Sequence, residues 1–188
     1  MMPEIFWWIF IFIALERIVE LVIAKRNEKW MLERGGVEWG RGHYKWFIVV
    51  HLLFFISILL EVTVRDYSNF VLNSYVFALF LLTQAARVWC IQSLGKFWNT
   101  KIIILPDCPL ISRGPYKFVK HPNYIIVGVE LFIIPIMFGA YFTAFLFPIL
   151  HLTLMTVRIP MENRALAELK KERDESSDPL KLKEKTNF

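Results

Sequence analysis

Two short groups of polar residues in the second half of the chain have types and spacing suited to binding an organic ligand. His121 and Tyr124 are three residues apart at the start of a long apolar stretch, so a helix there lets them converge on one ligand. The free amides at the start of such a helix favour an anionic group. Arg158 and Glu162 are four residues apart at the end of the same stretch, although Pro160 between them can displace them. A guanidinium grips a carboxylate through two hydrogen bonds, and a glutamate accepts from paired hydroxyls such as a ribose diol.

Each group also has an ordinary explanation, as an interfacial aromatic belt or as an Arg–Glu pair on a juxtamembrane helix. The apolar stretch between the groups, residues 124–158, is too long for one membrane span. It fits a tight helical hairpin with Gly139 and Ala140 near its middle. A hairpin returns both ends to one surface, where the two groups become neighbours, and this coincidence favours the functional interpretation.

The elements that must position these residues are membrane helices. The 188 residues are 56% hydrophobic, with mean hydropathy +0.44, and the apolar residues are gathered in blocks. A helix needs about 20 residues to cross about 30 Å of hydrocarbon. We therefore predict an all-α integral membrane bundle of about five transmembrane helices, followed by a short cytoplasmic C-terminal helix. The predicted spans are residues 5–24, 46–60, 70–94 and the hairpin 124–158, and whether both hairpin arms cross fully stays open.

Lysines and arginines set the predicted orientation of the chain. They gather in segments 25–45 and 95–123 and in the tail after Arg158, whereas segment 61–69 holds only Arg65. With five spans, the three basic segments lie on one side, which places the N-terminus outside and the C-terminus in the cytoplasm. This rule and contact with anionic lipid explain the net charge of +5 without a nucleic-acid partner. The two cysteines have no metal-ligand spacing, and no metal site is predicted.

Charged residues also lie inside the predicted spans, where charge is costly and tends to face the bundle interior. Glu16 and Glu20 share one helix face, and Arg17 lies off that face. We expect the two glutamates to form interhelical ion pairs that fix packing, and Arg87 is a further charge of this kind. Glu130 lies about two turns into its helix, and for it an ion pair and a polar cavity stay equally open.

Three segments of sequence carry a resemblance to a known family. They are ERIVELVIAKRNEKWMLERGGVEWGRGHY, LGKFWNTKIIILPDCPLISRGPYKFVKHPNY and, after the hairpin, VRIPMENRAL. The last two, within residues 94–166, resemble the isoprenylcysteine carboxyl methyltransferase family, and the first is similar to its small bacterial branch. The resemblance implies a membrane O-methyltransferase that uses S-adenosylmethionine and binds it at the cytoplasmic helix ends. By motif, His121, Pro122, Tyr124, Arg158 and Glu162 would bind this cofactor, and Arg158 and Glu162 would form the catalytic pair.

One departure from the family pattern bears on the chemistry. The family commonly has two adjacent glutamates, but the second position here is Asn163, which cannot act as a base. A carboxylate acceptor needs no base, whereas an enol or phenol acceptor can give its proton to Glu162 or His121. The aromatic faces of Tyr124 or Trp98 are candidates to stabilise the sulfonium of the cofactor.

The resemblance implies a lipophilic acceptor that enters sideways from the bilayer of a bacterial plasma membrane. The two acceptor classes are an alkylpyrone-type polyketide lipid and an isoprenylcysteine-like carboxylate. The alternative function is an NADPH-dependent membrane reductase of the sterol reductase type, which shares a related hairpin and an HPxY-like motif. A non-catalytic scaffold or small transporter is a third hypothesis. We expect residues 1–173 to form one membrane-embedded domain and residues 174–188 a charged, flexible tail.

Overall fold

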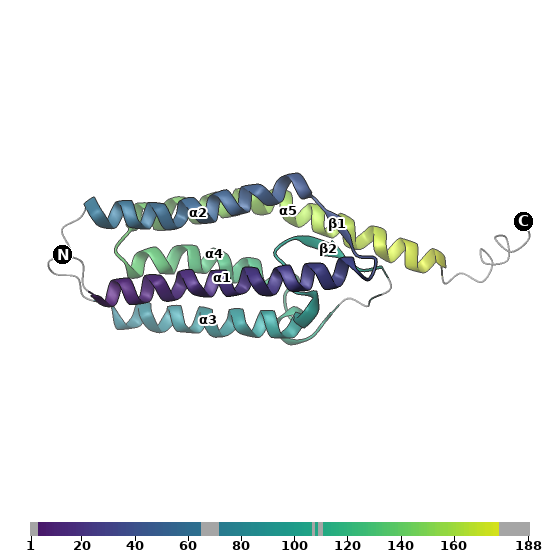
Figure 1. Cartoon of the computed structure of the whole chain (residues 1–188), viewed down its shortest axis with the longest axis horizontal. Helices are drawn as coiled ribbons and strands as arrows, with labels where there is room; N and C mark the ends of the chain where they lie inside the picture. Colours follow the sequence, from purple (N-terminus) through teal and green to yellow (C-terminus); the bar gives the residue numbers. More distant parts are fainter. Residues whose placement is uncertain (1–3, 65–71, 107, 109–110, 177–188) are drawn as a thin grey trace, which may run out of the picture.

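The computed structural model describes residues 4–64, 72–106, 108 and 111–176. Within these residues the chain forms five α-helices that lie along a common direction (Figure 1). They are α1 (Glu4–Leu32), α2 (Arg41–Val64), α3 (Ser74–Leu94), α4 (Pro122–Met137) and α5 (Tyr141–Ser176). The connections hold two 3-10 helices, η1 (Gly95–Phe97) and η2 (Gly114–Lys117), and two strands, β1 (Val37–Trp39) and β2 (Ile102–Ile104). The predicted helical bundle is confirmed, and the two short strands are an addition that the sequence did not predict.

Three helices in the described part of the chain are long and apolar enough to cross a membrane: Arg41–Val64, Ser74–Phe97 and Tyr141–Leu169. α4 is apolar but has only 16 residues. α1 has 29 residues and carries Glu16, Arg17 and Glu20 near its middle. The structure is therefore that of a helical membrane protein, and the number of five spans stays a prediction.

The hairpin between α4 and α5 turns where the sequence predicted. Gly139 lies in the turn with a φ of +70°, a left-handed conformation that glycine adopts without a steric penalty. Glu61 at the end of α2 caps the start of α5, because its carboxylate accepts hydrogen bonds from the backbone N–H groups of Phe142 and Thr143 at 2.9 Å each. The turn is thus fixed both by its own backbone and by a neighbouring helix.

α5 is one continuous helix of 36 residues that includes Pro148 and Pro160. The C-terminal helix that was predicted as a separate element is therefore the continuation of the second hairpin arm. α5 runs to Ser176, beyond position 174 where the flexible tail was predicted to start. The rest of that predicted tail, residues 177–188, lies outside the described residues.

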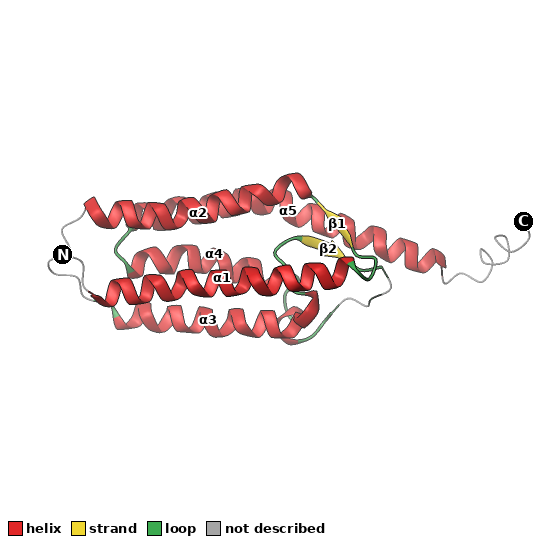
Figure 2. Ribbon diagram, in the orientation of Figure 1, coloured by secondary structure: helices red, strands yellow, loops and turns green. Residues whose placement is uncertain are grey.

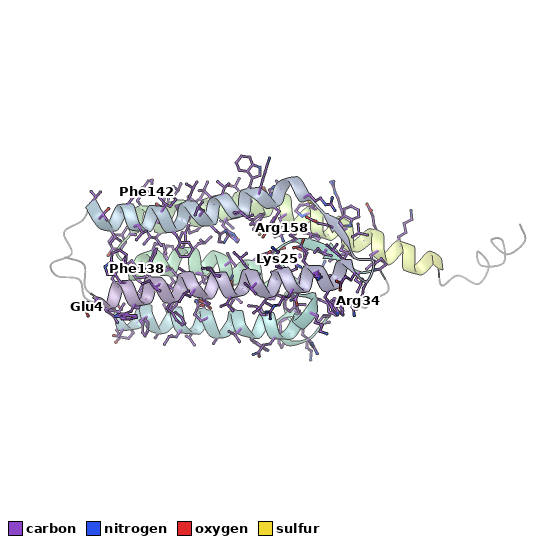
Figure 3. All side chains as sticks on the ribbon, in the orientation of Figure 1. Glu4, Lys25, Arg34, Phe138, Phe142 and Arg158 are labelled. Carbon is purple, nitrogen blue, oxygen red and sulfur yellow. The ribbon has the colours of Figure 1, made fainter. Side chains whose placement is uncertain are left out.

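The chain runs up and down, so that alternate connections meet at the same end of the bundle (Figure 2). The two strands and the extension of α5 lie at one end, and the turn between α4 and α5 lies at the other (Figure 1). In Figure 3, Lys25, Arg34 and Arg158 lie in the half of the molecule toward the first end, and Phe138 and Phe142 lie at the second. The described parts of the three basic segments therefore lie toward the same end of the bundle, and the side of the membrane that this end faces stays a prediction.

The small sheet ties the connection after α1 to the connection after α3 and to α5. β1 pairs with β2 in antiparallel fashion. Ile102 and Ile104 of β2 are buried against Ala165 of α5. Gly40, directly after β1, has a φ of +67°, and a Cβ at this position would lie 2.1 Å from the Sδ of Met161. A glycine therefore lets the chain pass close to α5 before α2 begins.

A buried charge cluster joins α1, α3 and α4 inside the bundle. Its members are Glu16, Arg17, Glu20, Gln84, Arg87 and Glu130. Arg87 is 7% exposed and donates from Nη2 to Glu20 at 2.6 Å and from Nη1 to Glu130 at 2.5 Å. The predicted interhelical ion pair is therefore confirmed for Glu20.

The contacts of Glu16 and Arg17 differ from those predicted, which were an interhelical ion pair for Glu16 and a position off this face for Arg17. Among the ion pairs of the described residues, Glu16 forms one only with Arg17 of its own helix, at 3.4 Å. Arg17 was predicted to lie off this face, but its long side chain reaches Glu20 at 2.9 Å and Glu130 at 3.3 Å. A flexible arginine stem can carry its charge to a neighbouring face of the helix.

For Glu130 the structure shows both features that the sequence left open. Its carboxylate is 3% exposed and is bonded to Arg17, Gln84 and Arg87. It also lines a cavity of about 20 Å³ together with His51 of α2, which has room for roughly one water molecule. Because these hydrogen bonds join the carboxylate to the neighbouring helices α1 and α3, we assign Glu130 chiefly to packing.

Candidate functional site

The start of α4 positions the motif His121-Pro122-Asn123-Tyr124. Pro122 is the first residue of the helix, where its fixed φ suits the helix and its missing N–H leaves no bond unmade. His121 precedes it with non-helical backbone angles. One turn brings the rings of His121 and Tyr124 into a stacked arrangement, with centroids 5.4 Å apart and planes 14° apart. The two side chains therefore share one side of the helix start, as predicted.

The hydroxyl of Tyr124 joins the two groups that the sequence singled out. It donates to Glu162 Oε2 at 2.5 Å and accepts from Arg158 Nε at 2.8 Å. His121 Nδ1 lies 3.7 Å from the same oxygen of Glu162. The structure thus brings together His121, Tyr124, Arg158 and Glu162, which we call the polar cluster. Arg158 and Glu162 do not pair directly, because the tyrosine hydroxyl lies between them.

Two residues that the sequence did not indicate hold Arg158 from other elements. The guanidinium donates from Nη2 to the carbonyl of Thr100 at 2.6 Å, and its Cζ lies 4.8 Å from the centre of the Phe47 ring. Arg158 is 5% exposed, and its Nη1 has no hydrogen-bond partner among the described residues. Neither Thr100 nor Phe47 belongs to a local motif with Arg158, so no signal in the sequence could have linked them.

Several polar atoms around the start of α4 lack a hydrogen-bond partner. Within the described residues they are the buried atoms His121 Nε2, Asn123 Oδ1 and His151 Nδ1, the last on a ring whose Nε2 lies 3.0 Å from the Tyr124 carbonyl. Glu162 Oε1 also forms no hydrogen bond there, since this carboxylate contacts Tyr124 and His121 through Oε2. Buried polar atoms without partners are rare in native proteins. They gather here at one helix start, which makes this region a candidate binding site.

The structure also bears on the predictions made for Trp98 and Asn163. Trp98 is only 2% exposed, so its ring face is closed to a cofactor, and Tyr124 is the better candidate for contact with a sulfonium. Asn163, which stands where the family has its second glutamate, is exposed. Tyr116 of η2 is half-buried, and burial raises the pKa of its hydroxyl, which therefore stays protonated at neutral pH.

Comparison with known proteins assigns the chain to a family. The sequence profile of the isoprenylcysteine carboxyl methyltransferase (ICMT) family matches residues 76–168. The uncharacterized protein YpbQ of Bacillus subtilis is 38% identical over 163 residues, which are 87% of this chain and 97% of that protein. The chain belongs to the isoprenylcysteine carboxyl methyltransferase family. The ICMT family is one of membrane methyltransferases, so the resemblance seen in the sequence is confirmed.

A second relative of this ICMT-family chain is less similar in sequence. An uncharacterized protein of Haemophilus influenzae is 26% identical over 154 residues, which are 81% of this chain and 90% of that protein. No solved structure matches. The segment that matches the ICMT profile contains all of the predicted site residues, whereas α1, β1 and α2 lie upstream of it.

Proposed function

We propose that this protein is an S-adenosylmethionine-dependent O-methyltransferase of the membrane that acts on a lipophilic acceptor. The observation that carries the proposal is the polar cluster, in which one tyrosine hydroxyl joins Arg158 and Glu162 at the start of α4. Membership of the ICMT family supports methyl transfer over the NADPH-dependent reductase that the hairpin also suggested.

The residues present fit S-adenosylmethionine. Its carboxylate needs cationic or N–H donors, and Arg158 Nη1 is such a donor without a hydrogen-bond partner among the described residues. Its ammonium, ribose and adenine groups supply donors, and Glu162 Oε1, Asn123 Oδ1 and His121 Nε2 are available to accept. When bound, the cofactor supplies a methyl group on a cationic sulfur.

In this proposal the polar cluster binds and orients, because methyl transfer chiefly requires alignment of an oxygen with the methyl carbon. Arg158 binds the carboxylate of the cofactor, and Glu162 accepts from its hydroxyl or amine groups. The Tyr124 hydroxyl holds both side chains in place. His121 and Pro122 shape the helix start against which the cofactor lies.

The acceptor determines whether a base is needed. An isoprenylcysteine-like carboxylate is already ionised and needs none. An alkylpyrone-type hydroxyl has to lose a proton, and Glu162 Oε1 or His121 Nε2 can accept it, since neither atom has a hydrogen-bond partner in the described part of the chain. Asn163 is exposed and cannot act as a base, which removes the second carboxylate of the family pattern from this role.

We further propose that the polar cluster faces the cytoplasm and that the bundle lies in a bacterial plasma membrane. The described basic segments share the end of the bundle where Arg158 lies (Figure 3). Positive residues are retained on the cytoplasmic side of a membrane. The cofactor would then enter from the cytosol, and the acceptor from the bilayer.

A binding measurement tests the proposed cofactor. Protein reconstituted in lipid nanodiscs is titrated by calorimetry with S-adenosylhomocysteine and, separately, with NADPH. We expect saturable binding of S-adenosylhomocysteine that Glu162→Ala weakens and Asn163→Ala, one residue away and exposed, leaves unchanged. Binding of NADPH without binding of S-adenosylhomocysteine would overturn the proposal in favour of a reductase.

A further inference from the structure

Residues 99–101 form a short segment between η1 and β2, which we call the strap. The carbonyl of Thr100 in the strap accepts the 2.6 Å hydrogen bond from Arg158. Asn99 fixes the strap internally and to α1, because its Oδ1 accepts from the Lys101 backbone N–H at 2.9 Å and its Nδ2 donates to the Ala24 carbonyl at 3.3 Å. The arginine of the polar cluster is thus held by a backbone atom that lies 58 residues away in sequence.

α2 holds the same strap from its first turn. The hydroxyl of Tyr44 lies 3.0 Å from Thr100 Oγ1, within hydrogen-bonding distance. One turn further along α2, the ring of Phe47 packs against the guanidinium of Arg158. The first turns of α2 therefore contact both the arginine and the residue that holds it.

Lys101 anchors the other end of the strap through charge. Its Nζ lies 2.6 Å from Glu28 of α1 and 3.5 Å from Glu38 of β1. The hydrogen bond that Lys101 donates to Glu28 raises the pKa of Lys101, so the ion pairs persist through the neutral range. The lysine side chain is 23% exposed, so these pairs are partly shielded from salt.

We propose that the strap is a positioning device for Arg158, and that Tyr44, Thr100 and Lys101 are its positioning residues. A guanidinium is a rigid plane, so fixing Nε on Tyr124 and Nη2 on Thr100 also fixes the direction of Nη1, the nitrogen left for a ligand. The identity of that ligand rests on the proposed function. Tyr44 lies upstream of residues 76–168, so the orientation of the arginine depends on a part of the chain that the family profile does not cover.

The first test reads the arginine directly and needs no ligand. Protein labelled with ¹⁵N-arginine is placed in nanodiscs, and the Arg158 Nε–H resonance is assigned through its loss in Arg158→Lys. We expect Tyr44→Phe and Thr100→Val to shift or broaden this resonance, and Thr100→Ser, which keeps the hydroxyl, to leave it in place. An unchanged resonance in both Tyr44→Phe and Thr100→Val would overturn the inference.

The second test is a double-mutant cycle on the dissociation constant of S-adenosylhomocysteine. Loss of one hydrogen bond corresponds to roughly two- to tenfold weaker binding. We expect that effect for Tyr44→Phe and for Thr100→Val, with the double variant no weaker than either alone, because both remove the same bond. Lys101→Met should also weaken binding, and Lys101→Arg should restore most of it. Equal affinity of all variants, or additive losses in the double variant, would contradict the inference.

Two controls separate this inference from a general loss of fold and from failure of the proposed function. Tyr75→Phe removes the hydroxyl of a tyrosine that is 83% exposed at the start of α3, and should change neither measurement. The unfolding temperature of each variant is recorded. If Tyr44→Phe or Thr100→Val unfolds early, the comparison of Lys101→Met with Lys101→Arg decides the binding test. If wild-type protein fails to bind S-adenosylhomocysteine, the proposed function is wrong, whereas the resonance test still decides whether the strap holds Arg158.

Discussion

Replacing Tyr124 by phenylalanine tests the polar cluster with the smallest change of shape. The substitution removes one oxygen atom and with it the bonds to Glu162 at 2.5 Å and from Arg158 at 2.8 Å. Arg158 keeps its bond to Thr100, and Glu162 is 26% exposed and regains water, so the net loss is close to one charge-assisted hydrogen bond. Such a bond contributes about 1.5–3 kcal/mol. The affinity for a ligand of the cluster should therefore fall roughly 10- to 150-fold.

The assay is calorimetric titration of reconstituted Tyr124→Phe with S-adenosylhomocysteine, followed by kcat and KM once an acceptor is in hand. The matched control is Tyr116→Phe, since Tyr116 lies in the neighbouring η2 and has no hydrogen bond to the cluster among the described residues. We expect the control to bind within about twofold of wild type, which is the effect of less than one hydrogen bond. Wild-type affinity in a folded Tyr124→Phe variant would refute the reasoning that this hydroxyl holds Arg158 and Glu162 in their binding geometry.

Three other substitutions test the fold that carries the cluster. Arg87→Met leaves Glu20 and Glu130 without their main partner and should cost about 3–5 kcal/mol in unfolding titrations, unlike Arg26→Met at the exposed end of α1; equal stability of the two would contradict the role of the buried charge cluster. Glu61→Gln should weaken the cap of α5 by about 1 kcal/mol, and an unchanged unfolding curve would show that the cap contributes nothing. Gly40→Ala should lower the free energy of unfolding by about 1–3 kcal/mol, because Gly40 has a positive φ and a Cβ there would collide with Met161. Adding Met161→Ala should recover part of that loss, and a double variant as unstable as Gly40→Ala alone would contradict this explanation.

The features of this fold that the sequence predicted are those set by local composition. The third predicted span, residues 70–94, agrees closely with α3, which runs from Ser74 to Leu94. The two agree because the length of an apolar run directly reflects the helix that it forms. The turn at Gly139 was predictable for the same reason, since no single helix of that length fits a membrane. α1 and α2 extend beyond their predicted ends into charged sequence, where the apolar pattern no longer shows that the helix continues.

The features that the sequence missed depend on contacts between distant segments. The pairing of β1 with β2 and the bond between Thr100 and Arg158 each join residues more than fifty positions apart, and no local pattern encodes such a contact. Arg17 was misplaced because helix geometry fixes where a Cα lies but not where a long flexible side chain ends. The sequence did predict that the members of the polar cluster lie close together, because a hairpin makes its two ends neighbours however the other helices pack.

The central claim, methyl transfer from S-adenosylmethionine to a lipid, is tested most directly by a radiolabel experiment. Purified protein in nanodiscs is incubated with S-adenosylmethionine labelled in its methyl group and with a lipid extract of a bacterium that carries the gene, and the organic phase is counted. We predict label in a lipid product with wild-type protein and its loss with Glu162→Ala. Absence of label in the lipid fraction, together with NADPH-dependent reduction of a component of the same extract, would contradict the account.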